Sequence, residues 1–113
     1  MFHQRLICYQ MAMSIAKAMP SLIARWPKGY YYLSDQLKRA IASIVLNIAE
    51  GNARTSPLER KRFFEISRSS LVEIDTQLEI SSVLSLVTVQ QIDKLKEMLN
   101  KLFAKLTRLL ERT

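Results

Sequence analysis

Apolar residues recur along this chain at steps of three and four, the spacing that places side chains on one face of an α-helix. The pattern is most regular near the end of the sequence, where it keeps a heptad repeat. Thr88 and Gln91 stand just before that repeat with the spacing of a capping box, so a helix is predicted to begin there. The apolar positions of this helix are Ile92, Leu95, Leu99, Leu102, Leu106 and Leu109.

A second set of start signals lies in the middle of the chain. Ser56 is a good N-cap, Pro57 suits the first helical position, and Glu59 stands three residues after the cap. We therefore predict a helix over residues 57–84. Its predicted buried stripe consists of Phe64, Ser67, Leu71, Ile74, Leu78 and Ser81.

The first half of the chain predicts two further helices. One covers about residues 2–24, with Pro20 expected to kink it or end it early, and a turn follows at 26–29. The other begins near Ser34 as N-cap and leaves through a left-handed exit at Gly51 and Asn52. The predicted stripe of the first helix is Phe2, Leu6, Tyr9, Met13 and Ala16, and that of the second is Leu37, Ala40, Ile41, Ile44, Val45 and Ile48.

Four helices of this length joined by short turns favour antiparallel neighbours. The expected fold is therefore all-α, an antiparallel up-down-up-down four-helix bundle formed by one domain over residues 1–113. The composition agrees, because about half of the residues (49%) are hydrophobic and the chain has only 2 Gly and 3 Pro. Such a composition excludes a disordered tail and a Gly/Pro-rich all-β design.

The sequence offers little material for catalysis. His3 is the one histidine and Cys8 the one cysteine, which argues against a protein-only zinc site, a nucleophile pair and a disulfide framework. We expect no enzyme, no metal and no cofactor. Charged or amide residues interrupt the apolar stretches, so neither a membrane-spanning segment nor a cleaved export leader is expected. The single cysteine fits a reducing cytoplasm, and the expected location is cytoplasmic, with no membrane among the expected partners.

The formal charge of +7 indicates an anionic partner, either a nucleic acid or a membrane surface. One basic cluster lies at the start of the third predicted helix, and a basic stripe follows one outer face of the fourth. These candidate nucleic-acid-binding residues are Arg60, Lys61, Arg62, Lys94, Lys101, Lys105, Arg108 and Arg112. The alternative is that the charge serves solubility alone in a structural protein-interaction module with no nucleic-acid ligand.

Polar residues also occur next to the buried stripe of the second predicted helix. Asn47 and Glu50 flank Ile48, and we expect both to be partly buried and therefore hydrogen-bonded or ion-paired. Together with Arg39 and Glu73 they are predicted to form a structural polar network rather than a ligand site.

Residues 43–51 form the string SIVLNIAEG. It resembles the signature S-I-x-x-N-I-A-E-G of the four-helix-bundle proteins encoded in intervening sequences of bacterial 23S ribosomal RNA genes. The turn at 26–28, the stretch at 36–40 and the pattern around Phe63 and Ser70 are also similar to that family. Val45, Ser67 and Ser69 depart from its usual residues, and these departures affect helix contacts more than the fold.

The resemblance implies partners as well as a fold. The same superfamily includes the accessory variability determinants of diversity-generating retroelements, basic bundles that form a pentameric barrel and bind a reverse transcriptase and template RNA. It therefore implies a homopentamer that binds RNA or a ribonucleoprotein, with a reverse transcriptase as a possible partner in the retroelement case. Neither branch is known as an enzyme by itself.

Overall fold

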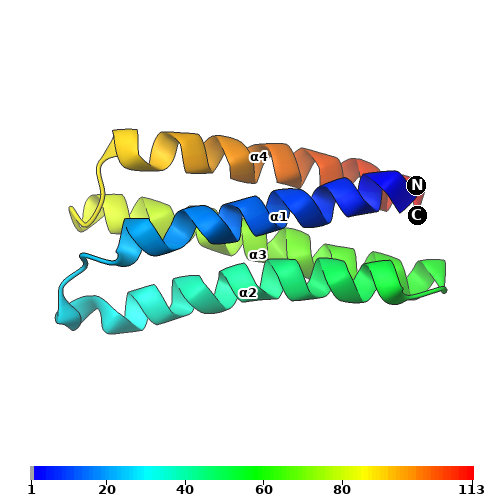
Figure 1. Cartoon of the computed structure of the whole chain (residues 1–113), viewed down its shortest axis with the longest axis horizontal. Coiled ribbons are helices and arrows are strands. Elements are labelled where there is room, and N and C mark those ends of the chain that lie inside the picture. The colour runs from blue at the N-terminus through cyan, green and yellow to red at the C-terminus, as the bar shows by residue number, and fades with distance from the viewer. Residues whose placement is uncertain (1) are drawn as a thin grey trace.

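The computed structural model describes residues 2–113 and contains four long helices joined by short connections (Figure 1). Over this range the secondary structure is helical, with no strand. The elements in chain order are α1 (Phe2–Ile23), the short 3₁₀ helix η1 (Lys28–Tyr30), α2 (Tyr31–Ala53), α3 (Pro57–Val83) and α4 (Val89–Arg112).

The four helices lie along the long axis of a body measuring 44 × 23 × 19 Å. The helix α1 packs against α2 and α4, and α3 packs against the same two helices, so the four surround one core. In Figure 1 the marked N and C ends lie at one end of the bundle together with the α2–α3 turn. The α1–α2 and α3–α4 connections lie at the opposite end. We refer to these as the termini end and the far end.

The predicted stripes of α2, α3 and α4 are confirmed as core positions. The α4 heptad residues are all buried, and Leu110 joins them at the last turn. Each such side chain contributes about 1.5–3 kcal/mol when fully buried, which makes α4 a major source of apolar stabilisation. The buried apolar residues of α2 are Leu37, Ala40, Ile41, Ile44 and Ile48, with Val45 partly buried against them.

The predicted stripe of α1 is wrong at its start and only marginal elsewhere. Phe2 and Leu6 are 61% and 42% exposed, whereas Tyr9 and Ala16 are partly buried beside the face that enters the core. The core-facing residues are Cys8, Ala12, Ile15, Met19 and Ile23. Apolar residues occupy more than one side of α1, so more than one face of the helix has apolar residues at steps of three and four. The spacing therefore does not reveal which face is buried.

Both predicted ends of α2 are also wrong. The helix begins at Tyr31, and the Ser34 hydroxyl donates to the Tyr31 carbonyl at 3.0 Å inside it instead of capping its N-terminus. At the other end α2 continues to Ala53, and Gly51 has a negative φ. A Cβ at Gly51 would lie 2.5 Å from Cε1 of Phe64, so glycine is required here for close helix packing and not for a left-handed exit. The helix α1 ends at Ile23, close to the predicted residue 24, so Pro20 does not end it early.

The start signals of α3 and α4 are confirmed. The Ser56 hydroxyl accepts a hydrogen bond from the Glu59 backbone N–H at 3.4 Å, with Pro57 in the first turn. At α4, the Thr88 hydroxyl accepts from the Gln91 backbone N–H at 3.2 Å, and the Thr88 backbone N–H donates to the Gln91 side chain at 2.8 Å. This reciprocal pair is a complete capping box.

The expectation that every apolar stretch is too interrupted to span a membrane is wrong for α1. By length and composition alone this helix is apolar enough to cross one. Core helices of soluble proteins and N-terminal leader sequences pass the same test. In this structure five residues of α1 are buried in the bundle core, so the apolar character of the helix has a packing role.

Candidate nucleic-acid interface

Positive charge is concentrated at the termini end of the bundle. Contacts between helices fix which residues share a level: Ser43 bonds Ser70, and Arg68 bonds Thr107. The half at the termini end therefore comprises about residues 2–12, 43–71 and 101–113, with ten basic and four acidic residues. The other half carries seven basic and six acidic residues. Nearly all of the net charge thus lies in one half.

Part of the predicted α4 stripe contributes to this concentration. Lys94, Lys101, Lys105, Arg108 and Arg112 share one side of α4, because they are separated by seven, four, three and four residues in a continuous helix. That side borders α1. The stripe nevertheless spans both halves of the bundle. Lys94 lines a hollow at the far end, together with Leu22 of α1. The last three basic residues of the stripe line a second hollow at the termini end, beside Gln4 and Cys8 of α1; they are Lys105, Arg108 and Arg112.

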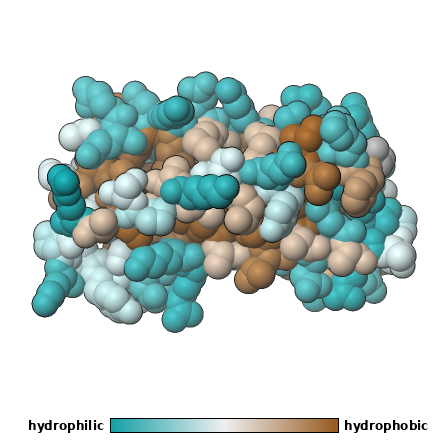
Figure 2. All heavy atoms as spheres, in the orientation of Figure 1, coloured by the Kyte–Doolittle hydropathy of each residue, from teal (hydrophilic) through white to brown (hydrophobic). Residues whose placement is uncertain are grey.

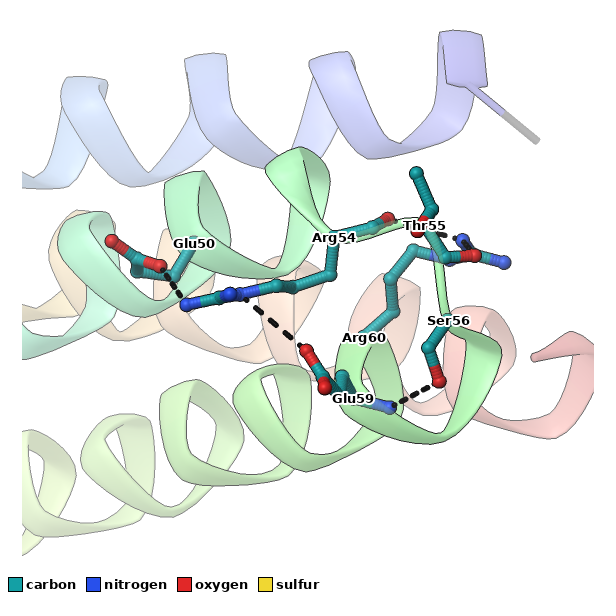
Figure 3. A network of polar contacts seen from close by, with 6 residues as sticks. All are labelled: Glu50, Arg54, Thr55, Ser56, Glu59 and Arg60. Atoms are coloured by element: carbon teal, nitrogen blue, oxygen red, sulfur yellow. Dashed lines mark hydrogen bonds and ion pairs between the residues drawn. The ribbon is translucent and has the colours of Figure 1, made fainter.

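The basic cluster at the start of α3 has two kinds of members. Lys61 and Arg62 are exposed. Arg60 is half-buried, and its Nη1 donates to the backbone carbonyls of Arg54 at 3.1 Å and Thr55 at 2.7 Å (Figure 3). Arg60 therefore satisfies carbonyl groups at the C-terminal end of α2 and closes the α2–α3 turn. Sequence reasoning missed this role, because neither the charge nor the helix period of Arg60 indicates it.

Arg54 links α2 to α3 at the same turn. Its guanidinium pairs with Glu50 at 3.0 Å and Glu59 at 3.7 Å, as Figure 3 shows, and lies 5.2 Å from the centre of the Phe63 ring. All three charged side chains are about half exposed, so each pair contributes little stability. The two carboxylates offset local positive charge and hold Arg54 against α3.

The predicted polar network is not a single network among the described residues. Asn47 donates to the Ser43 carbonyl at 2.8 Å and to its hydroxyl at 3.1 Å. Arg39 instead pairs with Asp35. The remaining two predicted members, Glu50 and Glu73, are exposed, which corrects the expectation that Glu50 is partly buried. Glu50 is separated from the core because it lies on the outer side of α2, two residues beyond Ile48.

Serines form the actual polar seam between α2 and α3. The Ser43 hydroxyl lies 2.9 Å from that of Ser70, and the fully buried Ser67 donates to the Ile44 carbonyl at 3.0 Å. Small hydroxyl side chains allow the two helices to approach closely while satisfying polar groups. The helical spacing of α3 predicts Ser67 on the buried face, and a serine at a core position is the sequence signal for this seam.

The far half is nearly neutral because its basic residues are matched by acids. Lys96 on α4 bonds Glu79 and lies 3.6 Å from Asp75, both on α3. The hydrogen bond to Glu79, helped by the charges of both carboxylates, raises the pKa of Lys96 above its ordinary value despite partial burial. Residues 2–113 contain no group of three His, Cys, Asp or Glu side chains placed to hold a metal ion.

Comparison with known proteins agrees with this architecture. No curated protein matches the chain. A family model described as 23S rRNA-intervening sequence protein matches residues 4–108, which is nearly the whole sequence. The SIVLNIAEG string, which supplies Asn47, Glu50 and the close-packed Gly51, lies inside that match. The chain therefore belongs to the 23S rRNA-intervening sequence protein family.

Proposed function

We propose that this protein is a non-enzymatic bundle that binds RNA, alone or within a ribonucleoprotein, through its termini end. The observation that carries the proposal is the concentration of net positive charge in that half of the bundle. A charge that served solubility alone has no reason to collect at one end, whereas a phosphate backbone is recognised by such a patch.

Five basic side chains form the core of this proposed surface. Each is without an ion pair to a carboxylate among the described residues, so its charge is available to a ligand. They come from both basic segments, and the fold brings these segments to one end. The five residues are Lys61, Arg62, Lys105, Arg108 and Arg112. Arg60 and Lys101 contribute less in this proposal, because Arg60 holds a turn and Lys101 pairs with Glu97 at 3.3 Å.

Salt dependence of binding tests the proposal. If five phosphates are engaged on a single strand, the slope of log affinity against log salt is about −3.5. Fluorescence anisotropy with a labelled RNA between 50 and 300 mM salt measures it. The double variant Lys61→Gln/Arg62→Gln should reduce the magnitude of the slope by about 1.4, since two contacts are lost. No binding at the lowest salt would refute the proposal.

A matched control removes the same charge from the other half of the bundle. Lys38 and Lys94 are both exposed, and each lines a hollow with the last turns of α1, at the far end. The double variant Lys38→Gln/Lys94→Gln should therefore leave the slope almost unchanged. An equal loss in both double variants would show that net charge matters and that the termini end has no special role.

The protein is further proposed to act as a cytoplasmic homo-oligomer, with five up-down-up-down subunits as the family resemblance implies. The support is a set of apolar side chains that the single chain leaves 40–62% exposed on α2 and α3. They are Leu46, Ile66, Val72 and Ile80. Figure 2 also shows hydrophobic side chains running along the face crossed by α1. Light scattering coupled to size exclusion should give about five times 13.1 kDa, and a monomer at micromolar concentration would contradict this.

Those exposed apolar residues also favour a second candidate function. In it the bundle is a structural module that binds proteins and has no nucleic-acid ligand. A reverse transcriptase would be such a partner in the retroelement case, but there RNA would be bound as well. An oligomer that fails to bind any RNA at 50 mM salt would favour the module, because electrostatic binding is strongest there.

A further inference from the structure

A small hollow lies between the first turns of α1 and the last turns of α4, at the termini end. Its volume is about 150 Å³, well below the 300 Å³ or so at which sites for drug-sized ligands begin. It can therefore accept one compact chemical group but not a whole nucleoside. The lining residues are Gln4, Cys8, Lys105, Arg108, Leu109 and Arg112.

The charges around this hollow are unbalanced. Three of its lining side chains are cationic, and none pairs with a carboxylate in the part of the chain that the structure describes. Gln4 stands in the first turn of α1, which has no acidic residue, so the partial positive charge of that helix end is offset only by the partial negative charge of the neighbouring α4 end. Like charges gathered in this way repel each other, and an anion placed among them would relieve the repulsion.

The inner wall of the hollow is uncharged. Leu109 is apolar, and the Cys8 side chain is buried in the bundle core. Burial raises the pKa of the Cys8 thiol and the Lys105 charge opposes this shift, so the thiol stays protonated at neutral pH. No anionic side chain of the lining therefore competes for the three cations. The Gln4 amide can add a neutral hydrogen-bond donor from the α1 side.

We propose that this hollow binds the terminal phosphate of an RNA strand. A phosphate monoester carries close to two negative charges at pH 7 and three acceptor oxygens, which suits a hollow lined by three cationic side chains. An internal phosphodiester carries only one charge and has a sugar on each side, so it suits three cations in a small hollow less well than a terminal phosphate does. The proposal rests on the proposed RNA-binding function for its ligand, but the site itself is tested separately.

Three versions of one short RNA distinguish the sources of phosphate. They share a single-stranded sequence of about ten nucleotides and carry a 5′-phosphate, a 3′-phosphate or hydroxyls at both ends, with the label at the other end or on an internal base. Anisotropy at constant salt should show about tenfold tighter binding of one of the two phosphorylated forms. Equal affinity for all three forms would overturn the proposal, because the hollow would then not recognise a terminal phosphate.

Variants on α4 locate the preference. Arg108→Gln/Arg112→Gln should abolish the preference for the phosphorylated end, whereas Lys94→Gln, on the same side of α4 but at the far end, should keep it. Arg108, Arg112 and Lys94 are all exposed, so folding is expected to persist, and circular dichroism checks this. A preference that survives in the double variant would place end recognition elsewhere and overturn the proposal.

Inorganic phosphate tests the hollow without RNA. Thermal unfolding should shift upward with millimolar phosphate in the parent and in Lys94→Gln, compared with chloride at equal ionic strength, but not in Arg108→Gln/Arg112→Gln. If no RNA binds yet phosphate stabilises in this manner, the RNA-binding function fails and the anion site stands. If RNA binds but neither phosphate nor a phosphorylated end has any effect, the anion site is refuted alone.

Discussion

Gly51 is the position where a single methyl group tests the packing of this bundle most directly. It lies inside α2, where alanine is intrinsically favoured over glycine by about 1 kcal/mol. The structure predicts the opposite outcome for Gly51→Ala, because the new Cβ would lie 2.5 Å and 2.8 Å from two carbons of the Phe64 ring. Ordinary contacts between carbon atoms are about 3.5–4.0 Å, so the overlap is roughly 1 Å.

The size of the effect follows from what Phe64 can do. Its side chain is fully buried, so the ring cannot move away without displacing other core residues. Overpacking of a core costs about 1–3 kcal/mol, and the upper part of this range applies to an overlap with an immobile ring. After subtracting the gain in helix propensity, we expect a net loss of about 1–2 kcal/mol in the free energy of unfolding.

Thermal unfolding followed by circular dichroism provides the assay. For a domain of 113 residues the unfolding entropy is about 0.24 kcal/mol/K, so the expected loss lowers Tm by about 4–8 °C. Gly29→Ala is the matched control, since nothing lies within 4 Å of a Cβ there. A Gly51→Ala variant that melts at or above the parent would refute the reasoning, and adding Phe64→Leu should recover part of the loss.

Three further predictions concern polar contacts. In urea unfolding, Asn47→Ala should lower the free energy of unfolding by about 0.5–1.5 kcal/mol, because Asn47 makes part-buried hydrogen bonds. Glu50→Ala should lower it by less than about 0.5 kcal/mol, because the Glu50 ion pair is exposed. Equal losses would contradict this. Thr88→Ala should cost about 1 kcal/mol through loss of its cap, with Thr88→Ser as the neutral control. The pKa of Lys96 is raised in the folded state, so its ion pairs stabilise the fold fully below the unfolded pKa of 10.5. This stabilisation disappears as the pH rises through the folded pKa. The variant Lys96→Met should therefore show a smaller decline of Tm at alkaline pH than the parent.

Three of the four helices could be predicted with their buried faces. In α4 one side is apolar and the rest is mostly polar or charged, so one orientation toward a core is strongly favoured. In α1 the same reasoning fails, because Phe2 and Leu6 have the spacing of a stripe and so do Cys8 and Ile15. Which phase is buried depends on the surfaces that α2 and α4 present to α1.

The candidate site was predicted in parts. The basic residues of the third and fourth helices are evident from the sequence, but there Lys94 and Arg112 belong to one stripe. The fold places these two at opposite ends of the bundle and brings the end of α4 close to the first turns of α1. It also removes Arg60 from the set of free charges by hydrogen-bonding it to the α2–α3 turn.

The sequence by itself determined the helices, two of their caps, the buried faces of α2, α3 and α4, and the size of the positive charge. The net charge is a sum over the chain, and the other features repeat within about one helical turn, so a linear pattern contains them all. The tertiary structure alone decided which face of α1 is buried, that Gly51 receives the Phe64 ring, and that basic side chains of α3 and α4 collect at one end. Those features join residues far apart in the chain, and their positions follow from how whole helices pack.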